Sequence, residues 1–357
     1  MMKALDNINN IKGIDKSDML KLIKGLPYQC EKASLIADGS PDPKIDIKID
    51  NIVFSALGGS AIGADLVKTY LKDELNIPAF VCRNYSLPAF AGKNTLIFCI
   101  SYSGNTEEVL SSFKEACSRG SFIITIGSGG KLKEESKKNG LMHIDIPGGL
   151  PPRTTIGYTS IILLKIFSKI GLIKDRSLEI KGLRPLLEGI ERDEIGMDVP
   201  YDKNISKILA ESILGKFAIL YGTSDTTEIV VNRWRSQLAE NSKVLSSSHV
   251  LPEMNHNEIV GYEIIEKDIL KHLKVIMFRD QDDNDRTKLR IDITKEIISK
   301  KGIDVLEVER KEKTQLYRIF SLIYIGDYVS FYLSMLNNID PTPVEKIDYL
   351  KKRLKSV

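Results

Sequence analysis

The stretch from Thr95 to Leu110, which reads TLIFCISYSGNTEEVL, constrains the fold of this chain more than any other. Its first part, Thr95–Ile100, is a nearly unbroken apolar run, which is typical of a strand buried on both faces of a sheet. The segment Ser101–Thr106 is rich in small hydroxyl residues and leads into a helical pattern that begins at Glu107. The stretch therefore predicts a buried strand that passes directly into the N-terminus of a helix.

Hydroxyl side chains at such a junction favour the binding of an anion. The first-turn N–H groups of a helix have no partners within the helix, and the helix dipole is positive there. Hydroxyls and backbone amides together can hold a phosphate at that place. Helix capping is the alternative explanation, but one cap needs one such residue, whereas Ser101, Ser103, Asn105 and Thr106 all crowd this turn.

A second junction of this kind lies at residues 58–63, GGSAIG, after a predicted strand at Asn51–Leu57. Glycines there permit close approach of a ligand to the backbone, although the spacing does not match the dinucleotide fingerprint GxGxxG. With further strands predicted at Ala79–Cys82 and Phe122–Ile126, the order indicates a parallel sheet with helices on both faces. Since ligands bind beyond the carboxyl ends of such strands, we expect Ser60 to lie at the same edge as the first hydroxyl-rich turn.

The second half of the chain repeats this outline without the hydroxyl-rich turn. Strands are predicted at Lys216–Tyr221 and His272–Phe278, and Gly222–Thr227 leads from the first of them into a helix. The second strand is followed by a run of carboxylates within residues 280–285, which would repel a phosphate. If both halves share one fold, the second half must contribute something other than an anion site.

Arg153 lies in a proline- and glycine-rich connection, PGGLPPRTT, at residues 147–155. A plain linker with a solvated arginine is the alternative, but prolines stiffen the backbone and would hold Arg153 in place. A fixed guanidinium suits a developing oxyanion.

Glu240 and His256 are the candidate functional residues that the second half of the chain contributes. Glu240 ends a helical pattern, and His256 lies in a polar segment that looks too irregular to belong to a core. A metal site made by His249, His256 and Glu258 is conceivable, but the spacing fits no familiar ligand pattern. A Ser–His hydrolase is disfavoured because GxSxG is absent from the strand-to-helix turns.

The composition bounds the class of protein. Hydrophobic residues make up 42% and charged residues 28% of the 357 positions, as in soluble globular proteins of about two domains. A net charge of +3 without basic blocks does not indicate nucleic acid. The four cysteines show no CxxC spacing, so a reduced cytoplasm is expected. The N-terminus lacks an apolar signal core, and the longest apolar candidate for a membrane span, at residues 156–167, is short and contains Lys165.

Motifs distributed along the chain then resemble one family. These motifs are GGSAIG, SYSGNTEE, PGGLPPR, AEN followed by PEMNHNEIVG, and DPTPV followed by YLK, in this order from about residue 50 to the C-terminus. They resemble the bifunctional phosphoglucose/phosphomannose isomerases, which belong to the phosphoglucose isomerase superfamily. The resemblance implies an α/β fold of two sugar isomerase (SIS) domains, each a parallel sheet flanked by helices. The expected limits are 1–155 and 156–325 for the SIS domains and 326–357 for a C-terminal helical segment that returns to the active site.

The same resemblance implies roles for individual residues. The residues that would hold the sugar phosphate are Gly59, Ser60, Ser101, Ser103 and Thr106. Arg153 would stabilise the enediolate, Glu240 would be the base and His256 would open the sugar ring. Lys351 is the best match to the family's C-terminal helix lysine, with Lys346 and Lys352 as alternatives. Thr342 is small, and it is the candidate for providing the extra space in the pocket that isomerisation of mannose 6-phosphate requires.

The implied reaction moves a carbonyl between C1 and C2 through a cis-enediol, which needs a carboxylate base and a proton donor–acceptor but no metal or other cofactor. The resemblance also implies a cytoplasmic homodimer of carbohydrate metabolism, in glycolysis or gluconeogenesis, with His256 supplied across the interface. No membrane or nucleic-acid partner is expected. Two alternatives stay open: a SIS-domain sugar-phosphate sensor without turnover, and an isomerase of another sugar phosphate such as an aminosugar.

Overall fold

A computed structural model describes residues 4–354 and residue 356 of the chain, and its contacts divide it into two compact units. One unit runs from Gly25 to Glu188, and the other combines the segment up to Lys24 with the segment from Gly189 onward. The domain limits expected from the sequence, at 155/156 and 325/326, differ from this division. Helix α7 (Ile156–Lys169) packs against helices of the first unit, and residue 325 lies inside one continuous helix of the second.

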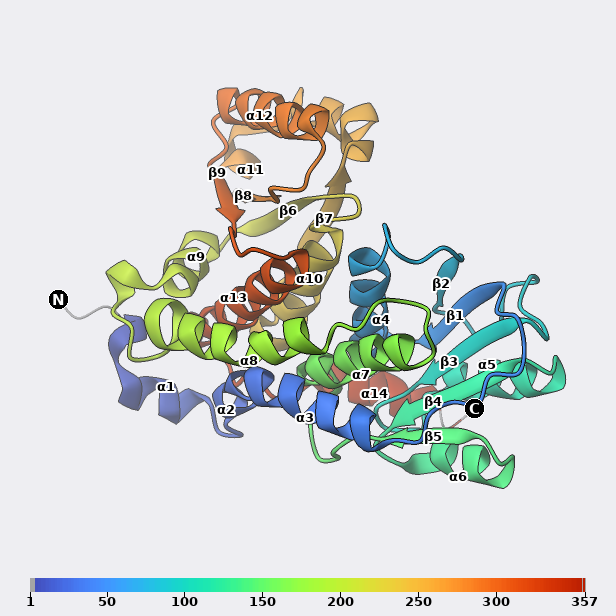
Figure 1. The fold of residues 1–357 in the computed structure, drawn as a ribbon. Helices are drawn as coiled ribbons and strands as arrows, with labels where there is room; N and C mark the ends of the chain where they lie inside the picture. The colour runs from blue at the N-terminus through green and yellow to red at the C-terminus, as the bar shows by residue number, and fades with distance from the viewer. Residues whose placement is uncertain (1–3, 355, 357) are drawn as a thin grey trace. The chain divides into compact units, whose positions relative to one another are not determined.

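The first unit contains a parallel sheet in the order β2-β1-β3-β4-β5, with helices along it (Figure 1). Its strands are β1 (Asn51–Ala56), β2 (Ala79–Cys82), β3 (Thr95–Ile100), β4 (Phe122–Gly127) and β5 (Met142–Asp145). Its helices are α3 (Leu26–Gly39), α4 (Gly58–Tyr70), α5 (Glu107–Ser118), α6 (Gly130–Lys138), η2 (Pro152–Thr154), α7 and α8 (Ser177–Ile190). The predicted parallel sheet is confirmed, while β5 was not predicted.

Both faces of the central strands are buried, which explains the unbroken apolar run in β3. Val53 pairs with Ile97 and packs in a core cluster with Phe113 of α5. The neighbouring pair, Phe54 and Phe98, points to the opposite face, where both rings contact Phe167 of α7 at centroid distances of 6.0 and 5.6 Å. Alternate residues of each strand therefore fill two different helix–sheet layers.

The second unit contains a shorter parallel sheet in the order β7-β6-β8-β9. Its strands are β6 (Phe217–Thr223), β7 (Ser246–Leu251), β8 (Leu273–Arg279) and β9 (Val305–Glu309). Its main helices are α1 (Ile8–Ile14), α2 (Met19–Lys24), α9 (Ile205–Ile213), α10 (Glu228–Ser242), α11 (Lys267–Leu270), α12 (Asp285–Lys300), α13 (Gln315–Leu336) and α14 (Glu345–Leu354). Short 3-10 or π turns complete it: η1 (Ala4–Asp6), η3 (Glu191–Ile195), η4 (Tyr201–Lys203), η5 (Glu253–His256) and η6 (Glu258–Tyr262). Strands β6 and β8 confirm the predicted pair, while β7 and β9 were not predicted.

The segment around His256 is more ordered than its composition indicates. It forms η5 and η6, and Met254 and Tyr262 pack in the core beside β6 and β8 with exposures of 2% and 5%. Within residues 252–258 only Met254 is buried, and His256 is exposed, so the expectation that this segment does not belong to a core holds except at Met254.

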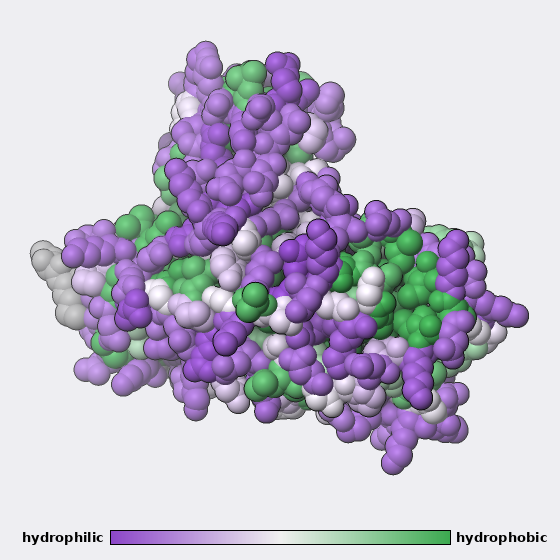
Figure 2. Space-filling model, in the orientation of Figure 1, coloured by the Kyte–Doolittle hydropathy of each residue, from purple (hydrophilic) through white to green (hydrophobic). Residues whose placement is uncertain are grey.

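Helix α13 is the core helix of the second unit. It is long and apolar enough to cross a membrane by composition alone, yet 94% of its most apolar window is buried inside the structure. The expectation that residues 156–167 are the longest apolar candidate for a span is wrong, because that stretch forms the 14-residue helix α7, whereas α13 has 22 residues. Hydrophilic side chains cover most of the face shown in Figure 2.

Candidate functional site

The carboxyl ends of β1 and β3 lie side by side at the point where the strand order of the first sheet reverses. The chain passes from β1 outward to β2 and then returns to β3 on the other side of β1. A crevice forms at such a point because the following loops diverge, and ligands of open α/β sheets bind there. The turn of Ser60 follows β1 and the turn of Ser101 follows β3. The predicted convergence of the two hydroxyl-rich turns is therefore a feature of the structure.

The Ser101–Thr106 turn brings two hydroxyls together at the start of α5. Ser101 is buried, and its hydroxyl lies 2.8 Å from the hydroxyl of Thr106. Thr106 occupies the N-cap position of α5 but makes no side-chain capping bond. Gly104 has φ +67°, and a Cβ there would lie 1.7 Å from the carbonyl oxygen of Gly129, so only glycine fits. Ser103 lies exposed on the same turn and accepts a bond from the N–H of Asn105 at 3.2 Å.

Tyr102, which was not among the candidates expected from the sequence, connects the parts of this edge. Its N–H donates to Oγ of Ser60 at 3.3 Å. Its phenol donates to the carbonyl of Pro147 at 3.0 Å and accepts from the N–H of Leu150 at 2.7 Å. Burial raises the pKa of this phenol, so it stays protonated at neutral pH. The tyrosine placed between two serines in SYSG was the available signal.

Arg153 is brought to the same edge by close packing of backbone on backbone. A Cβ on Gly59 would lie 2.6 Å from the carbonyl oxygen of Pro152 and 3.0 Å from the nitrogen of Arg153. Glycine at position 59 therefore allows the start of α4 to meet the η2 turn. Arg153 is only 3% exposed, as expected for an arginine held by a proline-stiffened turn. The first unit thus gathers Gly59, Ser60, Ser101, Ser103, Thr106 and Arg153 around the ends of β1 and β3.

Glu240 lies in the last turn of α10, a helix that is held on α13 by buried polar contacts. The guanidinium of Arg233 donates to the carboxylate of Asp327 at 2.7 Å, and Nε2 of Gln237 donates to the same carboxylate at 2.8 Å. One turn further on, Nδ2 of Asn241 donates to Oγ of Ser330 at 3.0 Å. Directional bonds of this kind set the rotation of α10, and so the direction in which Glu240 points.

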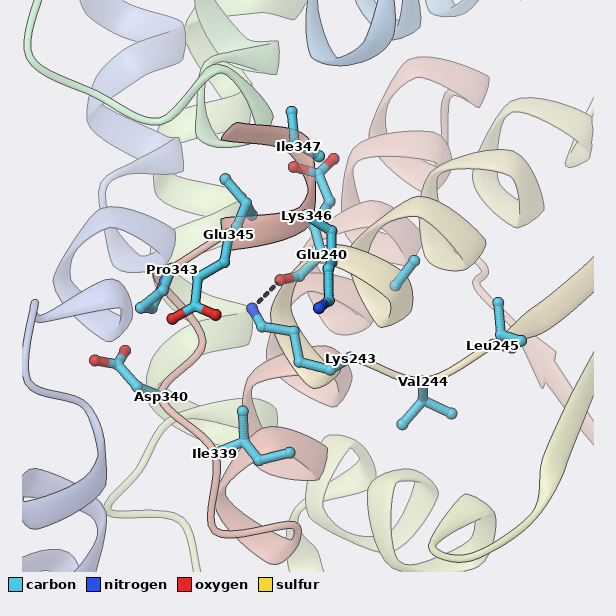
Figure 3. Close-up of a pocket in the computed structure, with 12 residues that line it drawn as sticks. Glu240, Lys243, Val244, Leu245, Ile339, Asp340, Pro343, Glu345, Lys346 and Ile347 are labelled. Carbon is cyan, nitrogen blue, oxygen red and sulfur yellow. Dashed lines mark hydrogen bonds between the residues drawn. The ribbon is translucent and has the colours of Figure 1, made fainter. Parts of the chain in front are cut away.

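Glu240 lines a pocket of about 710 Å³ within the second unit. The pocket is lined by Ala239, Glu240, Lys243, Val244, Leu245, Ile339, Asp340 and residues 343–347. Figure 3 shows Glu240 and Lys243 from the end of α10 beside Lys346 of α14. Of the C-terminal lysines considered from the sequence, Lys346 lines this pocket, while Lys351 and Lys352 lie exposed further along α14. Thr342 lies between the lining residues and donates its N–H to Asp340 at 3.0 Å.

His256 ends the η5 turn and is exposed in the single chain. The other residues of the conceivable metal site make a protein network instead. Nδ1 of His249 lies 2.9 Å from Glu258, which also accepts from the hydroxyl of Tyr221 at 2.6 Å. Within residues 4–354 and 356, no group of three or more His, Cys, Asp or Glu side chains is placed to hold a metal ion. The metal alternative gains no support from this geometry.

The reversal point of the second sheet is filled from within the chain. It lies between β6 and β8, as the first lies between β1 and β3. There the hydroxyls of Thr223 and Thr226 donate to one carboxylate oxygen of buried Asp283, at 2.6 and 2.5 Å. The N–H of Asp280 donates to the other oxygen at 3.0 Å. A carboxylate of the protein thus accepts the hydroxyl and N–H donors at this turn.

Comparison with known proteins agrees with this arrangement. The model of the bacterial phospho-glucose isomerase C-terminal SIS domain matches residues 202–354. A bifunctional phosphoglucose/phosphomannose isomerase of Caldicellulosiruptor bescii is 42% identical over 95% of this chain and 99% of its own length. A second bifunctional phosphoglucose/phosphomannose isomerase, of Aquifex aeolicus, is 35% identical over 95% of this chain and 98% of its own length. A solved structure, a hypothetical protein from Thermus thermophilus, shares the fold with a TM-score of 0.75 and 11% identity, over 98% of this chain and 93% of that one.

The sequence resemblance is therefore confirmed at full length, because identity of this level extends over almost the whole of both proteins. The chain belongs to the bifunctional phosphoglucose/phosphomannose isomerase family.

Proposed function

We propose that this protein interconverts glucose 6-phosphate and mannose 6-phosphate with fructose 6-phosphate through a cis-enediol intermediate. The observation that carries the proposal is the 42% identity to a bifunctional isomerase over 95% of the chain. The hydroxyl-rich edge of the first sheet and the pocket of Glu240 supply groups suited to the two tasks, anion binding and proton transfer.

The phosphate is bound by Gly59, Ser60, Ser101, Ser103 and Thr106. Paired hydroxyls and the backbone N–H groups at the start of α5 offer neutral donors with a positive dipole behind them, which suits a phosphate dianion. The buried guanidinium of Arg153 stabilises the charge that develops on the enediolate, since arginine stays protonated at every relevant pH.

The carboxylate of Glu240 removes the proton from C1 of open-chain fructose 6-phosphate and returns it to C2. The electron pair of the C–H bond forms the enediolate, and a proton moves from the hydroxyl of C1 to the oxygen of C2. Reprotonation of carbon at C2 then leaves an aldehyde at C1 and a hydroxyl at C2. Delivery to one face of C2 forms the glucose epimer, and delivery to the other face forms the mannose epimer. The intermediate must rotate before a proton can reach the other face of C2. We assign the space for this rotation to the surroundings of Thr342.

Ring opening is assigned to His256, with a C-terminal helix lysine near the ring oxygen. For this lysine we keep Lys351, the best match in the sequence, as one candidate. Lys346 is a second candidate, because it lines the pocket of Glu240. The exposure of His256 in one chain supports a homodimer in which this residue acts in the partner subunit's site. A cytoplasmic location belongs to the same proposal.

A coupled assay of the purified protein on fructose, mannose and glucose 6-phosphates, with and without EDTA, tests the proposal. Turnover of all three substrates that survives chelation is expected, because the proton transfers use side chains alone. Tight binding of sugar phosphate without turnover would instead identify a sensor. Loss of turnover in EDTA and its return with zinc would contradict the mechanism.

A further inference from the structure

Lys243 ends α10 in a backbone conformation that rarely suits a lysine. Its φ of +59° and ψ of +33° place it in the left-handed region, where glycine is the usual helix-terminating residue. Among the described residues, the other non-glycine residues with positive φ are Asp18, Asp225 and Asn338. Aspartate and asparagine tolerate this region through local hydrogen bonds, whereas a lysine is strained there. A glycine would end the helix with less strain, so the side chain of Lys243 needs another explanation.

The ammonium group of Lys243 joins two segments that line the same pocket. Nζ donates to the carbonyl oxygen of Glu240 and, at 3.0 Å, to that of Pro341 (Figure 3 shows the first of these). The first bond closes the last turn of α10, and the second reaches the segment that precedes α14. Both Glu240 and Lys243 line the pocket, and Pro341 adjoins Thr342.

The positive charge of Lys243 suits its place at the end of α10. The last carbonyl groups of a helix have no intrahelical partners and carry the negative end of the dipole, so a cation there is stabilising. The carboxylates of Asp340 and Glu345 also line the pocket, which keeps an ammonium group favourable at this place. An apolar side chain of similar length, such as methionine, would satisfy neither carbonyl oxygen.

We infer that Lys243 is a positioning residue for the isomerisation, a role that rests on the proposed function. It fixes the end of α10 against Pro341 and thereby holds the carboxylate of Glu240 at the reacting carbons. Because the same bond holds the segment of Thr342, Lys243 also sets the balance between the glucose and mannose reactions. Misplacement of a catalytic group by about 1 Å can cost a factor of roughly 100 in rate.

The decisive variant is Lys243→Gly, since glycine adopts φ near +60° without strain and the helix end is preserved. We expect its thermal unfolding midpoint to equal or exceed that of the unmodified protein, while kcat falls about tenfold or more and KM for fructose 6-phosphate changes less than about threefold. The ratio of mannose to glucose 6-phosphate turnover should also shift. Lys243→Arg, which keeps the cation, should recover more activity than Lys243→Met, which shares the strained backbone but lacks the donor.

Asp225→Gly is the matched control. Asp225 is exposed, has φ +66° and does not line the pocket, so this change relieves similar strain without altering the kinetics. Wild-type kcat and an unchanged substrate ratio in Lys243→Gly would overturn the inference and leave Lys243 as a helix end only. Absence of isomerisation in the unmodified protein would instead overturn the proposed function, so the two failures are distinguishable.

Discussion

Oγ of Ser60 accepts a hydrogen bond from the N–H of Tyr102 at 3.3 Å and so joins the turn after β1 to the turn after β3. Neither turn alone surrounds an anion, because each presents its groups from one side. The phenol of Tyr102 extends the connection to Pro147 and Leu150, in the loop that leads to Arg153. The proposed phosphate site therefore depends on contacts between segments that lie far apart in the sequence.

A negative charge placed in this site should prevent phosphate binding. Two like charges about 4 Å apart repel by roughly 4 kcal/mol at an effective dielectric constant of 20. Ser101→Asp should therefore raise KM for each sugar phosphate more than about tenfold while the fold survives. Steady-state kinetics and circular dichroism measure the two effects. The control is Ser118→Asp, at the exposed end of α5, the helix that follows this turn. A wild-type KM in Ser101→Asp would show that the turn does not bind phosphate.

A methyl group on Gly59 should disturb Arg153 through the backbone. The added Cβ would meet Pro152 O at 2.6 Å, so α4 and η2 must separate. Overpacking of this kind typically costs about 1–3 kcal/mol of stability. We expect Gly59→Ala to lower both the unfolding midpoint and kcat. Gly148→Ala, where the nearest atom lies 3.8 Å away in the loop that leads to Arg153, should change neither. Equal behaviour of the two variants would argue against the role of this contact.

Loss of basicity at Glu240 should abolish proton transfer and leave binding intact. Glu240→Gln keeps the shape of the side chain, and removal of a general base typically lowers the rate by about 10²–10⁴-fold. Turnover of glucose and mannose 6-phosphates should fall together, because both pass through one enediol. In deuterium oxide the unmodified protein should place deuterium at C1 of the ketose or C2 of the aldoses, and the variant should not. Glu228→Gln, in the first turn of the same helix, serves as control. Retained exchange in Glu240→Gln would exclude Glu240 as the base.

Removal of the internal carboxylate from the second sheet should affect stability rather than substrate binding. Asp283→Ala leaves the buried donors of Thr223 and Thr226 without their shared acceptor, which should cost about 2 kcal/mol. The midpoint of thermal unfolding should fall, while KM stays at the wild-type value. Asp285→Ala, whose side chain is 98% exposed, should change neither quantity. A large rise of KM in Asp283→Ala would mean that this turn takes part in substrate binding.

Most strands predicted from the sequence have both faces buried, and the edge strand β2, which was also predicted, is the exception. β1, β3 and β8 are nearly continuous apolar runs, because every side chain of such a strand meets a helix layer. The strands that were missed, β5, β7 and β9, lie at or near the edges of their sheets. The sequence SSSHVL of β7 is polar and half-exposed, so it carries no apolar pattern, and only pairing with β6 makes it a strand.

The sequence by itself determined the family, the parallel α/β architecture and the two turns that present hydroxyls, since each depends on residues that are close together in the chain. Only the tertiary structure decided which groups meet: Ser60 with Tyr102, Gly59 with Pro152, Asp283 with Thr223, and Lys346 rather than Lys351 beside the pocket of Glu240. These contacts join residues many positions apart. Their geometry follows from strand order and from the packing of helices on sheets, which local residue patterns do not specify.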